Sequence, residues 1–141
     1  MGRILALDYG LKRTGIAVTD PLKIIANKLT TIPTNELLKF LENYINNEKV
    51  EEIVIGYPMK LNNQPAEIVN QIDNFVKKFK IKFPEIDVKF IDERFTSKLA
   101  LQAMIEGGVP KNKRKNKELT DAISAVIILQ SYLEMLSNKN K

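Results

Sequence analysis

The sequence contains no cysteine and no histidine among its 141 residues. Without cysteine there are no disulfides, thiolate metal sites or thiol nucleophiles, a composition typical of proteins kept in a reducing compartment. Without histidine the chain cannot build a Ser-His-Asp triad, a histidine general base or a zinc site that needs imidazole. Any catalysis therefore has to rely on carboxylates, lysines, hydroxyls or a bound metal ion.

Long apolar stretches are missing as well. The apolar run at the N-terminus ends at Asp8, which is too early for a signal peptide, and no segment approaches membrane-spanning length. We therefore expect a cytoplasmic protein without membrane association. Hydrophobic residues make up 44% of the chain and charged residues 28%, which is the balance of a soluble globular protein. The length fits one domain over residues 1–141.

The hydrophobic pattern predicts five strands, at residues 3–9, 15–19, 27–32, 52–57 and 88–91. Helices are expected from Leu37 to about Ile45, from Ile68 towards Pro84, over residues 97–106, and from near Lys117 onward. Pro33-Thr34 is expected to turn the chain and cap the first helix. Three strands joined without helices, followed by alternating helices and strands, imply an α/β fold with a mixed sheet flanked by helices.

The last helix carries two neighbouring lines of side chains. Its spacing predicts a core stripe through Ala122, Val126, Leu129, Leu133 and Leu136. Asp121, Ala125, Ile128 and Tyr132 follow an adjoining line. Asp121 is therefore expected at the margin of a buried face.

Three carboxylates stand where chemistry is plausible. Asp8 lies at the carboxyl end of an apolar strand, where α/β sheets bind ligands; alternatively it caps the turn at Gly10. Asp92-Glu93 end the fifth strand, and the alternative there is a solvated acidic turn. Asp121 otherwise stabilises its helix N-terminus. Asp8, Glu93 and Asp121 together could bind Mg²⁺ or Mn²⁺, as two ions, and support in-line phosphodiester hydrolysis.

A basic segment precedes the last helix. Its five cations are Lys111, Lys113, Arg114, Lys115 and Lys117, with no acid among them. The whole chain has a net charge of +5, so the remainder is neutral. The segment is expected to bind nucleic-acid phosphates beside Asp121, and the alternative is a solvated loop. If all five side chains met duplex phosphates, log K would fall against log salt with a slope approaching about −4.5.

Several short motifs occur in order along the chain. They are Leu7-Asp8-Tyr9-Gly10, Arg13-Thr14-Gly15-Ile16-Ala17-Val18 with Asp20, Gly56-Tyr57-Pro58, Asp92-Glu93-Arg94-Phe95-Thr96, and Asp121 with Ala125. Through them the chain resembles, over nearly its whole length, the YqgF or RuvX-like family of Holliday-junction resolvases and pre-16S rRNA nucleases. The resemblance implies a ribonuclease H-like fold, acidic positions at Asp8, Glu93 and Asp121, and phosphate-binding or acid-positioning roles for Arg13, Arg94 and Thr96. Asn62-Asn63 and Ser124 depart from the family pattern.

The family implies a metal-dependent endonuclease acting on structured nucleic acid. Processing of the 5′ end of pre-16S rRNA in ribosome biogenesis is the first expectation, and Holliday-junction resolution is the alternative. Two other classes stay open: a non-catalytic RNA-binding ribosome-assembly factor, and an actin-like or sugar-kinase protein, against which the short chain argues. A monomer or a weak homodimer is expected. The choice between Asp92 and Glu93 as metal ligand also stays open.

Overall fold

The computed structural model describes residues 2–57, 66–92 and 117–139. Its strands are β1 (Arg3–Tyr9), β2 (Arg13–Thr19), β3 (Ala26–Pro33), β4 (Val50–Tyr57) and β5 (Asp87–Asp92). Its helices are η1 (Thr34–Glu36), α1 (Leu37–Asn47), α2 (Ala66–Lys82) and α5 (Lys117–Lys139). The expected helix over residues 97–106 lies outside the described residues.

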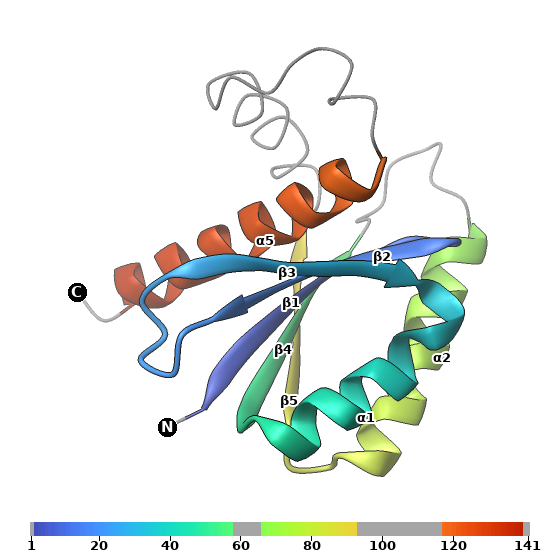
Figure 1. Cartoon of the computed structure of the whole chain (residues 1–141), viewed down its shortest axis with the longest axis horizontal. Helices are drawn as coiled ribbons and strands as arrows, with labels where there is room; N and C mark the ends of the chain where they lie inside the picture. The colour runs from blue at the N-terminus through green and yellow to red at the C-terminus, as the bar shows by residue number, and fades with distance from the viewer. Residues whose placement is uncertain (1, 58–65, 93–116, 140–141) are drawn as a thin grey trace.

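The five strands form one mixed sheet in the order β3-β2-β1-β4-β5. β1 pairs antiparallel with β2 and parallel with β4, and β4 pairs parallel with β5. Helices α1 and α2 cover one face of the sheet, and α5 crosses the other (Figure 1). The predicted α/β arrangement of a mixed sheet flanked by helices is thereby confirmed.

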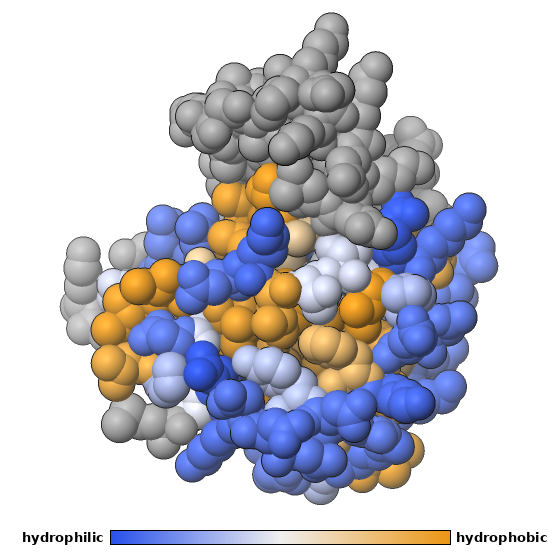
Figure 2. Space-filling model, viewed as in Figure 1, coloured by the Kyte–Doolittle hydropathy of each residue, from blue (hydrophilic) through white to orange (hydrophobic). Residues whose placement is uncertain are grey.

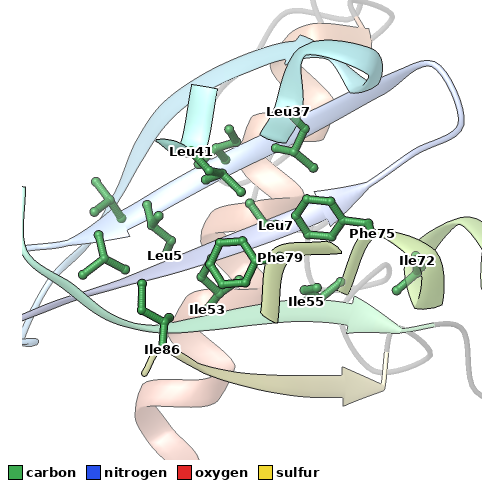
Figure 3. Close-up of a cluster of buried hydrophobic side chains, with 13 residues drawn as sticks. Leu5, Leu7, Leu37, Leu41, Ile53, Ile55, Ile72, Phe75, Phe79 and Ile86 are labelled. Carbon is green, nitrogen blue, oxygen red and sulfur yellow. The ribbon is translucent and has the colours of Figure 1, made fainter. Parts of the chain in front are cut away.

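Each face of the sheet has its own hydrophobic core. Alternate residues of a strand point to opposite faces, so Leu5 and Leu7 of β1 pack in the cluster beneath α1 and α2 (Figure 3). Ile4 and Ala6 pack in the second cluster, beneath α5. Asp8 continues the series of Ile4 and Ala6, so it belongs to the face covered by α5.

The cluster beneath α1 and α2 is rich in large side chains. Leu37 and Leu41 of α1 are one helical turn apart, and both are buried. Ile72, Phe75 and Phe79 follow the same spacing on α2, with the two phenyl rings 6.0 Å apart between centroids. Burial of each such side chain stabilises the fold by roughly 1.5–3 kcal/mol. This core fixes the sheet from which the candidate site is built.

The buried side of α5 differs from the predicted stripe. Ala125, Ile128, Leu129 and Tyr132 are buried, whereas Val126, Leu133 and Leu136 are only partly buried. The prediction was right for Ala122 and Leu129, which are buried, and wrong for the other three positions, whose place is taken by residues of the adjoining line. The cause is the small residues of the sheet: Ala6 and Ala17 pair across β1 and β2 and share the cluster with Ala125. Because all three side chains are methyl groups, the helix can approach the strands closely along this line.

The surface is hydrophilic over the outer sides of α1 and α2 (Figure 2). Hydrophobic surface gathers over the turn between β2 and β3, where Leu22, Ile24 and Ile25 are exposed. Among the described residues, none of the helices combines the length and apolarity required to cross a membrane.

Candidate functional site

Asp8 is partly buried near the carboxyl end of β1, on the face covered by α5. The strands β1, β4 and β5 are parallel, so their carboxyl ends lie at the same edge of the sheet. Loops leave this edge, and ligands of α/β proteins commonly bind there. The position predicted for Asp8 from the sequence is therefore found in the structure.

Two glycines flank Asp8 on the neighbouring strands. Gly15 of β2 is its direct partner in the antiparallel register. On the other side Leu7 pairs with Ile55, so the next position of β4, Gly56, lies beside Asp8. Neither glycine has a side chain to occupy the sheet surface next to the carboxylate. Both glycines belong to the sequence motifs, but their relationship to Asp8 was missed, although a glycine inside a strand often marks a close approach by a ligand or another backbone.

Asp92 ends β5 and pairs with Tyr57 of β4. The alternation of β5 places Val88 in the cluster beneath α1 and α2 and Ile91 in the cluster beneath α5. Asp92 therefore follows Val88 and belongs to the face opposite Asp8. In addition, β4 lies between β1 and β5. Neighbouring strands are about 4.8 Å apart, so the backbones of β1 and β5 are separated by about 10 Å. The structure does not bring Asp92 and Asp8 together.

The direction of α5 places position 121 at the same end of the sheet as Asp8. Burial and the neighbouring carboxylate of Glu52, near the amino end of β4, raise the pKa of the Tyr132 hydroxyl, so these two side chains are neighbours. From Tyr132 back to position 121 the helix covers about 16 Å. From Glu52 forward to Gly56, which is level with Asp8, the strand covers about 13 Å. Because α5 runs roughly antiparallel to β1 (Figure 1), its first turns lie towards the carboxyl edge; the side chain of Asp121 is outside the described set.

Arg13 begins β2, two residues before Gly15 and on the same strand face. Ile16 and Val18 of β2 pack beneath α1 and α2, whereas Ala17 packs beneath α5. The alternation therefore places Arg13 on the face of Asp8. A guanidinium at this position could bind a phosphate next to the carboxylate, because it offers several donors in a rigid plane.

The turn from β1 to β2 is fixed by threonines. Thr34 donates its hydroxyl hydrogen to the carbonyl oxygen of Gly10 at 2.7 Å, and its own oxygen lies 3.0 Å from the hydroxyl of buried Thr14. A Cβ on Gly10 would stand 2.4 Å from the carbonyl oxygen of Arg13, which explains why glycine is required. The expected helix cap at Thr34 is wrong, because neither η1 nor α1 has a side-chain cap. Thr34 holds the turn beside Asp8 instead.

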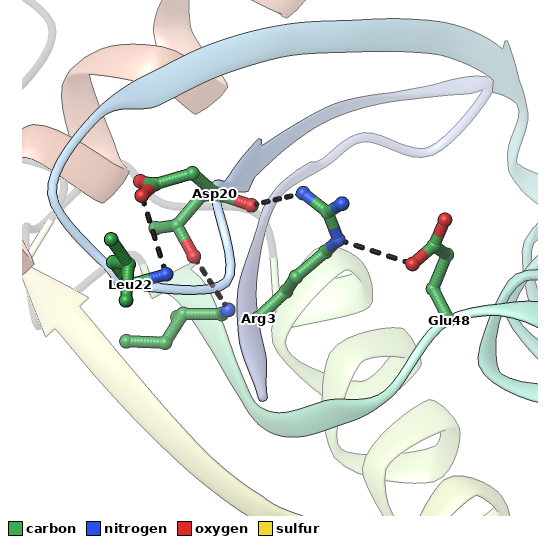
Figure 4. A network of polar contacts seen from close by, with 6 residues as sticks. Arg3, Asp20, Leu22 and Glu48 are labelled. Carbon is green, nitrogen blue, oxygen red and sulfur yellow. Dashed lines mark hydrogen bonds and ion pairs between the residues drawn. The ribbon is translucent and has the colours of Figure 1, made fainter. Parts of the chain in front are cut away.

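Asp20 belongs to one of the sequence motifs but has a structural role. Its carboxylate accepts the backbone N–H group of Leu22 at 3.2 Å (Figure 4) and those of Ile24 and Ile25 at 2.8 Å each. The hydrogen bond from Ile25 is the main cause that holds the pKa of Asp20 below its usual value, and the other backbone hydrogen bonds add to it. Asp20 lies in the turn that follows β2, at the end of the strand remote from Arg13. It therefore organises the β2–β3 turn.

Several predicted site residues lie outside the described residues. They are Glu93, Arg94, Thr96, Lys111, Lys113, Arg114 and Lys115. Lys117 begins α5, but its side chain is not described. Among the described side chains there is no group of three or more acidic residues that could hold a metal ion. Of the three carboxylates predicted as ligands, the structure thus shows the side chain of Asp8 alone.

A family model described as "RuvX: Holliday junction resolvase" matches residues 2–135 of the chain. A protein of Phocaeicola vulgatus named "Putative pre-16S rRNA nuclease" is 58% identical over 134 residues, which cover 95% of this chain and 96% of that protein. A protein of Christiangramia forsetii with the same name is 56% identical over 133 residues, covering 94% and 98%. These matches confirm the resemblance found in the motifs.

The chain is also similar to a solved structure, "T. thermophilus RuvC in complex with Holliday junction substrate". The TM-score is 0.59 at 16% identity, over 96% of both chains. This likeness confirms the ribonuclease H-like fold.

Proposed function

Because the chain belongs to the RuvX family of Holliday junction resolvases, we propose that it is a metal-dependent endonuclease that processes the 5′ end of pre-16S rRNA. One observation carries the proposal: Asp8 stands at the carboxyl edge of the sheet between Gly15 and Gly56, with no side chain on either lateral neighbour. A carboxylate in such a position can meet a ligand directly. The names of the curated relatives support the RNA substrate.

The donor chemistry of Asp8 fits a hard divalent cation. A carboxylate supplies the oxygen ligand that Mg²⁺ and Mn²⁺ prefer. We assign Asp8, Glu93 and Asp121 as the residues that would hold two such ions. When bound, these ions would activate water and stabilise the charge that develops on the cleaved phosphodiester. No histidine is available for a proton-transfer role at the site.

We assign Glu93 rather than Asp92 as the ion ligand because of the alternation of side chains along β5. Ile91 faces α5 and Asp92 follows the opposite series. Position 93 is two residues after Ile91, which makes it the candidate for the face of Asp8. Arg13 is assigned to bind the phosphate on the same face. We assign further phosphate contacts to Arg94, Thr96 and the basic segment Lys111, Lys113, Arg114, Lys115 and Lys117.

The decisive test is cleavage of an end-labelled pre-16S rRNA leader with Mg²⁺ or Mn²⁺. We expect cleavage by the parent chain and a loss of at least about a hundredfold in Asp8→Asn and Asp121→Asn. Asp87→Asn is the matched control, because Asp87 is exposed at the amino end of β5, the far edge of the sheet. RNA binding without parental cleavage would refute the nuclease and favour a non-catalytic ribosome-assembly factor.

Holliday-junction resolution is the second candidate. It is favoured by the description of the family model and by the Holliday junction substrate of the structurally similar RuvC. A four-way DNA junction assayed beside the rRNA leader separates the two. We expect the rRNA leader to be cut at the higher kcat/KM; a higher value on the junction would replace the rRNA assignment.

The basic segment is tested by the salt dependence of binding. If its five cations contact duplex phosphates, their replacement by alanine should flatten the slope of log K against log salt by up to about 4.5. An unchanged slope would show that the segment does not touch the nucleic-acid backbone.

A further inference from the structure

A groove of about 370 Å³ lies on the face of the sheet that α1 and α2 cover, opposite the face of Asp8 and next to the end of β1. Its wall combines Tyr9 of β1, Thr34 and Asn35 of η1, and Gln71, Asn74 and Lys78 of α2. From Gln71 to Lys78 is two helical turns, or about 10 Å of the helix. The groove therefore runs along α2 and reaches the strand that carries Asp8.

The groove has an unusual chemistry for a surface with many charged residues. Its lining includes the apolar Leu38 and Phe75. The polar part consists of Tyr9, Thr34, three residues with carboxamides (Asn35, Gln71 and Asn74) and one cation, Lys78, with no carboxylate among the described residues. Each carboxamide offers both donors and an acceptor, which matches the mixed donor and acceptor edges of a nucleobase. Lys78 adds a contact for a phosphate. A neutral-to-positive groove rich in amides suits a nucleotide better than it suits a metal ion or an acidic peptide.

Tyr9 gives the groove a fixed aromatic wall. Its ring packs 5.7 Å from the ring of Phe75 between centroids, and its hydroxyl lies 3.5 Å from Oε1 of Gln71. Aromatic side chains of this kind stack the bases of single-stranded nucleic acids, which duplexes keep inaccessible.

The groove and Asp8 occupy adjacent residues of one strand. Tyr9 follows Asp8 directly, and the alternation of β1 sends the two side chains to opposite faces. A nucleic-acid strand that crosses the carboxyl edge of the sheet can thus meet both. The connected Thr34, Gly10 and Thr14 hydrogen bonds keep the groove wall and the turn beside Asp8 in one rigid unit.

We propose that this groove binds one unpaired nucleotide of the substrate strand, next to the bond cleaved at Asp8. The inference rests on the proposed nuclease function. It specifies the substrate further: the chain prefers a cleavage site with an unpaired nucleotide beside it over one within a continuous duplex.

Binding of short oligonucleotides tests the groove without cleavage. The double variant Gln71→Ala/Asn74→Ala is made in an Asp8→Asn background, and its Kd for a fluorescein-labelled single-stranded RNA and for a blunt RNA duplex is measured by anisotropy. We expect single-strand binding to weaken by at least about tenfold, because the double variant removes two side chains that contact the base. Duplex binding should stay unchanged. Lys78→Ala should weaken single-strand binding to a smaller extent.

Asn70→Ala and Lys77→Ala are the matched controls, because both residues lie on α2 but do not line the groove. We expect both to bind RNA as the parent does. Equal weakening for single strand and duplex, or no weakening with a folded double variant, would overturn the groove assignment. The metal-dependent cleavage assay separates the two proposals. If the parent cuts RNA and the groove variants bind and cut it as well as the parent does, the groove assignment is refuted and the nuclease function is not. Groove-dependent RNA binding with no parental cleavage refutes the nuclease alone.

Discussion

Asp8 lies one residue before the end of β1 and Asp92 ends β5 at the same edge of the sheet, yet the two residues belong to opposite faces. The sequence could not separate Asp92 from Glu93 as a partner of Asp8, because both follow the fifth strand. The strand alternation of β5 argues against Asp92 and leaves Glu93 as the proposed ligand. Because Asp92 and Glu93 are adjacent, a substitution at one of them serves as the control for a substitution at the other.

Replacement of these two acids is the first prediction. Glu93→Gln should lower metal-dependent cleavage by at least about a hundredfold, because it removes a proposed ion ligand. Asp92→Asn should retain cleavage within about threefold, an effect below 1 kcal/mol. Initial rates on the same rRNA leader, with folding checked by circular dichroism, measure both. The reverse ranking would show that Asp92 is the ligand.

The glycine beside Asp8 on β4 gives the second prediction. Gly56→Ala puts a methyl group on the sheet surface next to the carboxylate. Alanine is by itself better tolerated than glycine in a strand, by roughly 0.5–1 kcal/mol, so the variant should fold. Crowding of the site should nevertheless lower kcat by about tenfold or more, as small displacements at reacting centres do. A folded variant that binds substrate and keeps the parental kcat would show that no ligand of Asp8 needs this space.

The threonine pair at the β1–β2 turn gives the third prediction. Thr34→Val keeps the shape of the side chain but removes its hydrogen bonds to Gly10 and Thr14. Since Thr14 is fully buried, the free energy of unfolding should fall by about 1–3 kcal/mol. Urea denaturation measures the change. Thr30→Val, on the partly exposed part of β3, is the control, and an equal loss there would mean that the pair adds nothing specific.

Asp20 gives the fourth prediction, which concerns pH. Its pKa is held below the ordinary value by backbone hydrogen bonds. The unfolded value is about 3.9, so the charged form adds stability above that pH, and this contribution is lost as the pH falls through the lower folded pKa. Asp20→Asn keeps an acceptor oxygen but no charge. Its Tm should therefore lie below that of the parent at pH 7, and the gap should close in strong acid. A gap independent of pH would contradict this role of the charge.

Much of the fold was predictable because the strands have a strong local pattern. The bounds of β1 were correct, whereas β2 begins at Arg13 rather than Gly15. The difference arises because Thr14 pairs with both Tyr9 and Ile32, which are tertiary contacts that no local pattern contains. The buried line of α5 was predicted only in part, at Ala122 and Leu129, for a similar reason. The close contact of Ala125 with the alanines of the sheet decides it, and helical spacing alone does not.

The candidate site was predictable at the level of residue type but not of geometry. The position of Asp8 at the end of an apolar strand was visible in the sequence. Its neighbours Gly15 and Gly56 depend on the register of three strands, and the groove beside Tyr9 depends on the packing of α2. Both arise from long-range pairing. Thr34 was misread for the same reason, because its partner Gly10 lies 24 positions earlier in the chain.

The claim that Asp8 holds a divalent ion is tested most directly by measuring the affinity of the pure protein for Mn²⁺. Isothermal titration calorimetry gives this affinity. Asp8→Asn should keep the Tm of the parent and weaken Mn²⁺ binding by at least about tenfold, because an amide is a poorer ligand than a carboxylate for a hard cation. Asp87→Asn should bind as the parent does. Equal Mn²⁺ affinity in the parent and in folded Asp8→Asn would contradict the account.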